Sequence, residues 1–271
     1  MDEEAIKSEI IDDIRENDEL LFDELSESLS QMMETLLNSE YPKTGRALFV
    51  LMNKLNSIKL AIFRCCESDN IYSSNILYRS FIEHYIKHEY IFSRWCTEKT
   101  DEVGIEYYKH CDMGENVSYL KALIKNKRIF RNEETSKDVY DILTEISDEF
   151  RNISHKFLKE KVEQFSYCNI IKYLQKNRGK YLLKKKNGYN YLESIIPEYS
   201  ELSSFIHGGP YAEFKLITYS KEDKRDEYIR NLSRTAFNLS TFTKMTTYIF
   251  ATQVDKKYGE SAKILFKYFP I

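Results

Sequence analysis

The sequence predicts an all-α protein, a multi-helix bundle that begins with a long acidic helix. Only 8 of the 271 residues are Gly and 4 are Pro, too few turn formers for the many hairpins of a β-sandwich or barrel. Apolar residues recur at spacings of three and four along most of the chain, which is typical of amphipathic helices. With 21 Tyr and 16 Phe, the expected core is largely aromatic and needs hydrogen-bond partners for buried hydroxyls.

The first element is an acidic helical segment, residues 1–40, ahead of a helical bundle at residues 41–271, and we prefer to treat both as one domain. Residues 2–27 carry twelve acids against two bases, Lys7 and Arg15. An apolar stripe on the other face predicts a helix with a break near Asn17, where the stripe has a gap. The stripe consists of Ile6, Ile10, Ile14, Leu21, Leu25, Leu29, Met32, Met33 and Leu36.

The next two helices should lie at the centre of the bundle. Thr44 follows a Tyr-Pro-Lys turn and is a candidate cap for a helix that runs to about Glu67. The pattern restarts after residues 68–70. The third helix, Ile71 to Cys96, is apolar around most of its circumference, which favours a buried position.

The remaining elements are shorter or less regular. We expect interrupted helices over 98–131 with breaks at Gly104 and at 112–114, because glycine is a poor helix former. Further helical segments are predicted by periodicity and by stop signals such as Gly208-Gly209-Pro210. They cover about 135–173, 189–207 and 224–254, with a short helix after Gly259.

Composition and motifs exclude several functional classes. The net charge of -3 argues against a general nucleic-acid coat. Five irregularly spaced cysteines predict reduced thiols, and with no apolar run of about 18 residues we expect a cytoplasmic protein without a membrane anchor. Phosphate-binding glycine loops, zinc motifs and nucleophile elbows are missing from the sequence, so we predict no cofactor and no metal site.

One basic stretch stands out against this background. Residues 172–186 contain seven bases and no acid. Such a cluster can attract the backbone of an RNA even when the whole chain is acidic. The RNA-binding candidates within it are Lys180, Lys184, Lys185 and Lys186.

The strongest candidate site lies in the third helix, at Arg79 and Glu83. They are four residues apart and share a helix face, so they form either an exposed ion pair worth a few tenths of a kcal/mol or a buried pair that belongs to a network or a site. His84 is a further candidate. His84 and His88 also have the spacing of two metal ligands, but packing or exposure explains them more simply.

A second candidate patch lies at residues 199–209, where Ser203 and His207 are one turn apart. The alternative is that His207 only caps the helix beside the glycine stop. Arg151 and His155 form a third pair, which we interpret as an ordinary exposed face.

These stretches carry a family resemblance. Residues 58–92, with the core Leu77-Tyr-Arg79-Ser-Phe-Ile-Glu83, resemble the bacterial family known as domain of unknown function 5677. The Leu-Ser pair and the following His in residues 199–207 resemble the second motif of that family. Together the two stretches cover less than a fifth of the chain.

The resemblance implies a function, because that family is similar to the HEPN-like helical proteins. That group includes metal-independent ribonucleases of toxin and phage-defence systems, which use an Arg and a His separated by four to six residues, commonly as dimers. Arg79 and His84 fit this spacing. In such an enzyme Arg79 would bind phosphate, His207 or His84 would transfer the proton, and Glu83 would orient its partners.

Two other functions stay open. In one, the protein is a non-catalytic nucleotide- or protein-binding regulatory module, and Arg79, Glu83, Ser203 and His207 line a pocket or lock the bundle. In the other, the acidic first helix docks onto a partner protein or a second subunit, since we also expect a homo-oligomer. Geometry separates the first two, because catalysis requires an Arg and a His that converge on an open cleft.

Overall fold

Helices account for almost all of the chain in the computed structural model, which describes residues 3–134, 137–146, 150, 151, 153–177 and 191–268. No strand occurs in these ranges, so the predicted all-α multi-helix bundle is confirmed. The helices are α1 (Glu3–Leu37), α2 (Pro42–Glu67), α3 (Ile71–Glu98), α4 (Glu102–Arg131), α5 (Val139–Ile146), α6 (His155–Gln164), α7 (Tyr167–Asn177), α8 (Tyr191–His207), α9 (Pro210–Thr218), α10 (Glu222–Val254) and α11 (Gly259–Tyr268), with a 3-10 turn at Lys256–Tyr258.

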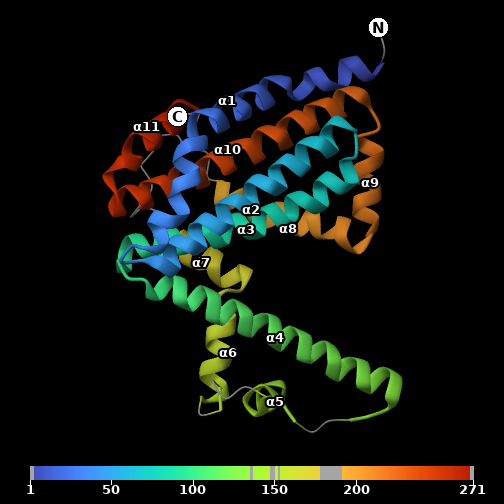
Figure 1. The fold of residues 1–271 in the computed structure, drawn as a ribbon. Coiled ribbons are helices and arrows are strands. Elements are labelled where there is room, and N and C mark those ends of the chain that lie inside the picture. The colour runs from blue at the N-terminus through green and yellow to red at the C-terminus, as the bar shows by residue number, and fades with distance from the viewer. Residues whose placement is uncertain (1–2, 135–136, 147–149, 152, 178–190, 269–271) are drawn as a thin grey trace.

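Four long helices form the body of the molecule (Figure 1). Helix α2 lies between α1, α3 and α10 and packs against all three, while α8 covers α3 and α11 covers α10. The inward faces carry fully buried side chains such as Leu48, Phe81 and Phe250. None of the described helices combines the length and apolarity that a membrane crossing requires.

Helix α1 is continuous, so the predicted break near Asn17 is wrong. The gap in the apolar stripe is filled by Asp18, whose side chain is buried instead of lying on the acidic face. Asp18 occupies the stripe position between Ile14 and Leu21, which are both at most 5% exposed. The apolar face of α1 belongs to the same core as α2, α3 and α10.

The start of α2 is capped by a residue far away in the sequence. The side chain of Asp101 accepts hydrogen bonds from the backbone N–H groups of Lys43 (3.1 Å) and Thr44 (2.7 Å). Thr44, predicted as the cap, lies inside the helix, and its hydroxyl accepts a hydrogen bond from the N–H of Gly104 at 3.0 Å.

Helix α4 runs without interruption through both predicted breaks, which were therefore wrong. Gly104 is needed for close contact between helices, because a Cβ there would lie 2.2 Å from the backbone nitrogen of Thr44. Gly114 is simply tolerated, since a Cβ would meet only Val162 at 3.6 Å. A glycine inside a helix costs about 1 kcal/mol, which tertiary packing readily overrides.

The far half of α4 projects from the body with α5 and α6, and we call residues 113–164 the arm (Figure 1). The arm has a small core of its own, separate from the main one. Where helical periodicity was expected from about 135 to 173, the chain forms the three short helices α5, α6 and α7. The arm core consists of Met113, Val117, Val139, Leu143, Phe150 and Leu158.

Candidate functional site

Arg79 and Glu83 on α3 meet two residues of α8 and form one polar network. Arg79 donates from Nε to the Ser203 hydroxyl (3.2 Å) and from NH2 to the Tyr199 hydroxyl (2.6 Å), and its NH1 lies 3.1 Å from Glu83 Oε1. Tyr199 in turn donates to Glu83 Oε1 at 2.7 Å. The structure therefore brings together three predicted site residues that are up to 124 positions apart.

Aromatic contacts hold this network in place. The Arg79 guanidinium lies 4.4 Å from the centre of the Tyr199 ring, which itself stacks on Tyr167 with 4.0 Å between ring centres. Burial and the hydrogen bond to Glu83 raise the pKa of Tyr199 to about 12. Tyr199 is thus a neutral donor near pH 7, and it joins the cation to the carboxylate.

Every nitrogen of the Arg79 guanidinium has a partner within the network. The side chains of Arg79 and Glu83 are 21% and 35% exposed, so the pair is only partly open to solvent. Such an arrangement locks α8 onto α3 with charge-assisted hydrogen bonds. Both described contacts of Glu83, to Arg79 and to Tyr199, are made by its Oε1 atom.

The two histidines predicted for proton transfer lie away from the network contacts. His84 places Nδ1 2.8 Å from the carbonyl oxygen of Ser80, and with Lys54 and Ser57 it lines an open depression next to α2. Burial lowers the pKa of His84. His207 is exposed in the last turn of α8, and no described contact joins it to Arg79.

Other sequence candidates have plain structural roles or lie outside the described residues. His88 is buried and bonds to Thr247 Oγ1 at 2.9 Å, while His155 is exposed near Asp141. No group of three or more His, Cys, Asp or Glu side chains in the described part of the chain is placed to hold a metal ion. The predicted RNA-binding lysines Lys180, Lys184, Lys185 and Lys186 fall in residues 178–190, outside the described ranges.

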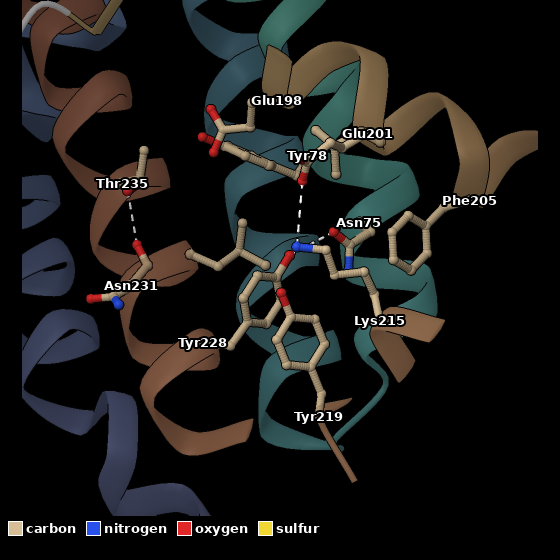
Figure 2. A pocket seen from close by; sticks show the side chains of 12 residues that line it. Asn75, Tyr78, Glu198, Glu201, Phe205, Lys215, Tyr219, Tyr228, Asn231 and Thr235 are labelled. Atoms are coloured by element: carbon tan, nitrogen blue, oxygen red, sulfur yellow. Dashed lines mark hydrogen bonds and ion pairs between the residues drawn. The ribbon is translucent and has the colours of Figure 1, made fainter. Parts of the chain in front are cut away.

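Helices α3 and α8, which carry the network, also line a pocket of about 140 Å³, shown in Figure 2. Its walls come from α3, α8, α9 and α10 and from the turn at Tyr219. Polar side chains from all four helices face it, together with Leu202, Leu232 and Phe205. The polar ones are Asn75, Tyr78, Glu198, Glu201, Lys215, Tyr219, Tyr228, Asn231 and Thr235.

The pocket walls are tied by specific contacts. The Tyr228 hydroxyl donates to Asn75 Oδ1 at 2.5 Å, and the Tyr228 ring stacks on Tyr219 with 4.2 Å between centres. Lys215 Nζ lies 3.6 Å from Glu201 Oε2, a contact drawn in Figure 2. Burial raises the pKa of Tyr228 far above its ordinary value, so it stays a neutral hydrogen-bond donor.

The pocket was not predicted from the sequence, although residues next to its lining were named as site candidates. Asn75 is one turn before Arg79 on α3, and Glu201 is two positions before Ser203. Those two polar residues could have indicated the pocket. No sequence pattern pointed to Lys215 and Tyr219, because α9 was not predicted.

In the part of the chain that the structure describes, the protein is all-helical, with a polar network between α3 and α8 and a pocket of about 140 Å³ that α3 and α8 help to line. Residues 45–228 match the model of a protein family described as a family of unknown function, DUF5677. This chain belongs to that family, as its resemblance at residues 58–92 and 199–207 predicted. The matched region includes the network and most of the pocket. No curated protein and no solved structure matches the chain.

Proposed function

We propose that this protein is a non-catalytic, cytoplasmic binding module and that its ligand occupies the pocket between α3, α8, α9 and α10. The observation that carries the proposal is the contrast between two neighbouring polar groups. The Arg79 network uses its hydrogen bonds internally, as a structural lock does. The polar groups of the pocket also pair with one another, Tyr228 with Asn75 and Lys215 with Glu201, but they surround a cavity that tyrosine, amide, carboxylate and ammonium groups from several helices line together.

The size of the pocket limits the ligand. A cavity of about 150 Å³ holds a benzene-sized ring. The pocket volume of about 140 Å³ therefore suits a single ring or a compact chain of similar bulk. A whole nucleotide does not fit inside, although the base of one does if its sugar and phosphate point outward.

The charges of the pocket lining determine which class of ligand the pocket favours. Two carboxylates, Glu198 and Glu201, face the pocket with one ammonium, Lys215. Tyrosine faces also attract cations. We therefore assign the pocket to a compact nitrogenous ligand that donates N–H hydrogen bonds, such as an amine, a guanidine or the amino edge of a nucleobase.

Binding at this place would affect the helix arrangement. Helices α8 and α9 are joined by Gly208, which has a left-handed φ of 62°, and both contribute to the pocket. A ligand that contacts Glu201 and Lys215 bridges these two helices. This gives the module a regulatory output, since occupancy stabilises one orientation of α9 relative to α8.

Calorimetric titration with small probes tests the proposal. Methylguanidine and cytosine are the N–H donors, and benzoate is the anion of similar size. We expect donor binding that weakens about tenfold, or about 1.4 kcal/mol, in Glu201→Gln. Glu213→Gln, which changes an exposed carboxylate of α9 outside the pocket lining, is the matched control and should bind normally. Benzoate binding as tightly as methylguanidine would contradict the assignment.

A metal-independent ribonuclease of defence or toxin type is the second candidate. Ser203, which bonds Arg79, and His207 share a face of α8 one turn apart, so a phosphate held at Arg79 would lie along the helix from an exposed imidazole. The assay is cleavage of total RNA and purified tRNA in excess chelator. Activity that disappears in both folded variants, Arg79→Ala and His207→Ala, would favour the enzyme over the binding module.

A further inference from the structure

The end of α4 presents a basic and apolar surface that no described part of the molecule covers. We call residues 118–131 the arm helix. Phe130 is 79% exposed and Tyr119 is 64% exposed, which is high for aromatic side chains. Five bases accompany them and no acid occurs in the segment. These exposed bases are Lys121, Lys125, Lys127, Arg128 and Arg131, and none forms an ion pair with a residue that the structure describes.

Helix α1 carries the opposite charge on its outer face, which we call the acidic ridge. Its one base with a described side chain, Arg15, is paired with Glu67 at 2.7 Å. Leu20 and Phe22 are about half exposed along this helix, at 49% and 52%. The exposed acids of the ridge are Asp12, Asp13, Glu16, Glu19, Asp23, Glu24, Glu27 and Glu34.

The two surfaces match in length as well as in charge. At 1.5 Å per residue, the arm helix extends about 21 Å and the most acidic part of the ridge, residues 12–27, about 24 Å. Both combine charge with exposed large apolar side chains. One surface alone would not identify its partner, but the pair is complementary in sign, length and apolar content.

Within one molecule these surfaces cannot meet, because α1 lies at one end and the arm at the other (Figure 1). We propose that they meet between two copies of this chain, the arm helix of each copy lying on the acidic ridge of the other. A twofold axis makes both contacts at once and closes the assembly as a dimer. The proposal does not depend on the ligand pocket.

Charge reversal with mixing tests the dimer. The arm variant is Lys125→Glu/Arg128→Glu, and the ridge variant is Asp23→Lys/Glu27→Lys; these side chains are exposed. In each variant alone, both contacts would join like charges, so we expect monomers. In a 1:1 mixture both contacts join opposite charges again, so we expect a heterodimer. Lys172→Glu/Lys176→Glu, exposed on α7, is the control and should remain dimeric.

The readout is molar mass from light scattering after size-exclusion chromatography. Wild type should have twice the chain mass at low salt and lose the dimer as screening rises toward about 1 M, where the Debye length is about 3 Å. A wild type that stays monomeric at low salt overturns the proposal, and so do single variants that remain dimeric. Arm-dependent binding of a single-stranded RNA oligonucleotide by a monomeric wild type would assign the arm helix to nucleic acid instead.

Discussion

At the residue scale, the least expected feature is a buried group of two lysines and one aspartate between α1, α2 and α10. Lys59 and Lys244 are 0% and 4% exposed, and both lie against Asp18, Lys244 at 3.6 Å. Lys59 also donates to Asn56 Oδ1 at 2.9 Å. One carboxylate thus faces two cations in the core, where charges are costly unless balanced.

This excess of positive charge lowers the affinity of the two buried lysines for protons. Burial, then repulsion from Lys244, lowers the pKa of Lys59 to about 7, and burial also lowers the pKa of Lys244. The unfolded chain, with a lysine pKa of 10.5, binds more protons above pH 7 than the folded one does. The free energy of unfolding should therefore rise with pH from about 7 toward 9 through this group.

We predict that Lys59→Met stabilises the protein by about 1–3 kcal/mol at pH 6, because it leaves a single balanced pair of Lys244 and Asp18. The gain should shrink at pH 8.5, where Lys59 is largely neutral in the wild type. Asp18→Asn is the opposite control and should cost about 3–5 kcal/mol. Urea unfolding followed by circular dichroism measures both. A Lys59→Met variant that is less stable at both pH values would refute this account.

Arg79, Glu83 and Asp18 show which side-chain contacts the sequence can predict and which it cannot. The spacing of Arg79 and Glu83 predicted a polar pair on a central helix, and that pair forms. Asp18 was assigned to the acidic face because acids dominate that segment, although its place in the apolar stripe predicted burial. Its two lysine partners are 41 and 226 positions away, and helical periodicity has no information about such distant contacts.

At the element scale, one carboxylate connects the arm to the body. Glu106 on α4 accepts hydrogen bonds from Arg94 of α3 at 2.5 Å, from Lys161 of α6 at 2.6 Å and from Gln164 at 3.1 Å. Burial alone would raise the pKa of Glu106, but the hydrogen bonds from Lys161 and Arg94 lower it to about 2. The carboxylate therefore stabilises the fold above pH 4.5, and this contribution is lost as the pH falls from 4.5 through 2.

We predict that Glu106→Gln loosens α6, because Lys161 loses its carboxylate while Arg94 keeps Glu98. A cost of about 2 kcal/mol is expected for breaking a largely buried charged hydrogen-bond group. Hydrogen exchange should show faster exchange in residues 155–164 and little change in α2. Glu115→Gln, an exposed carboxylate of the same helix, is the control, and equal exchange in both variants would contradict the assignment.

The continuity of α4 depends on contacts between segments that are distant in the sequence. The glycines of α4 predicted interruptions, since glycine lowers helix propensity. Helix α4 continues through Gly104 because this glycine lets the N-terminus of α2 pack closely against α4. The Asp101 side chain, just before α4, caps the same N-terminus of α2. Both causes require knowledge of which segments meet. Local patterns identified most long helices, but not the contacts that decide where helices persist.

At the scale of the whole molecule, α1 is part of the core although it lies outside the matched family region. Six of its apolar side chains are at most 5% exposed, and burial of each contributes about 1.5–3 kcal/mol. Their sum is comparable with the entire stability of a typical domain, about 5–15 kcal/mol. The six are Ile11, Ile14, Leu21, Leu25, Met32 and Leu36.

We therefore predict that residues 41–271 do not fold cooperatively without residues 1–40. Deletion exposes the apolar faces of α2 and α10 that pack against α1 and leaves Lys59 and Lys244 without Asp18. The truncated chain should bind a hydrophobic dye and lack a sharp thermal transition. In the matched control, a protease site inserted at residues 38–40 cuts the chain between α1 and α2, and both pieces should then coelute because their contact is noncovalent. A truncated chain that melts as sharply as the full one would contradict this prediction. In that case α1 would be a detachable docking segment, and the acidic ridge could leave the body while it stays bound to the arm helix of a second copy.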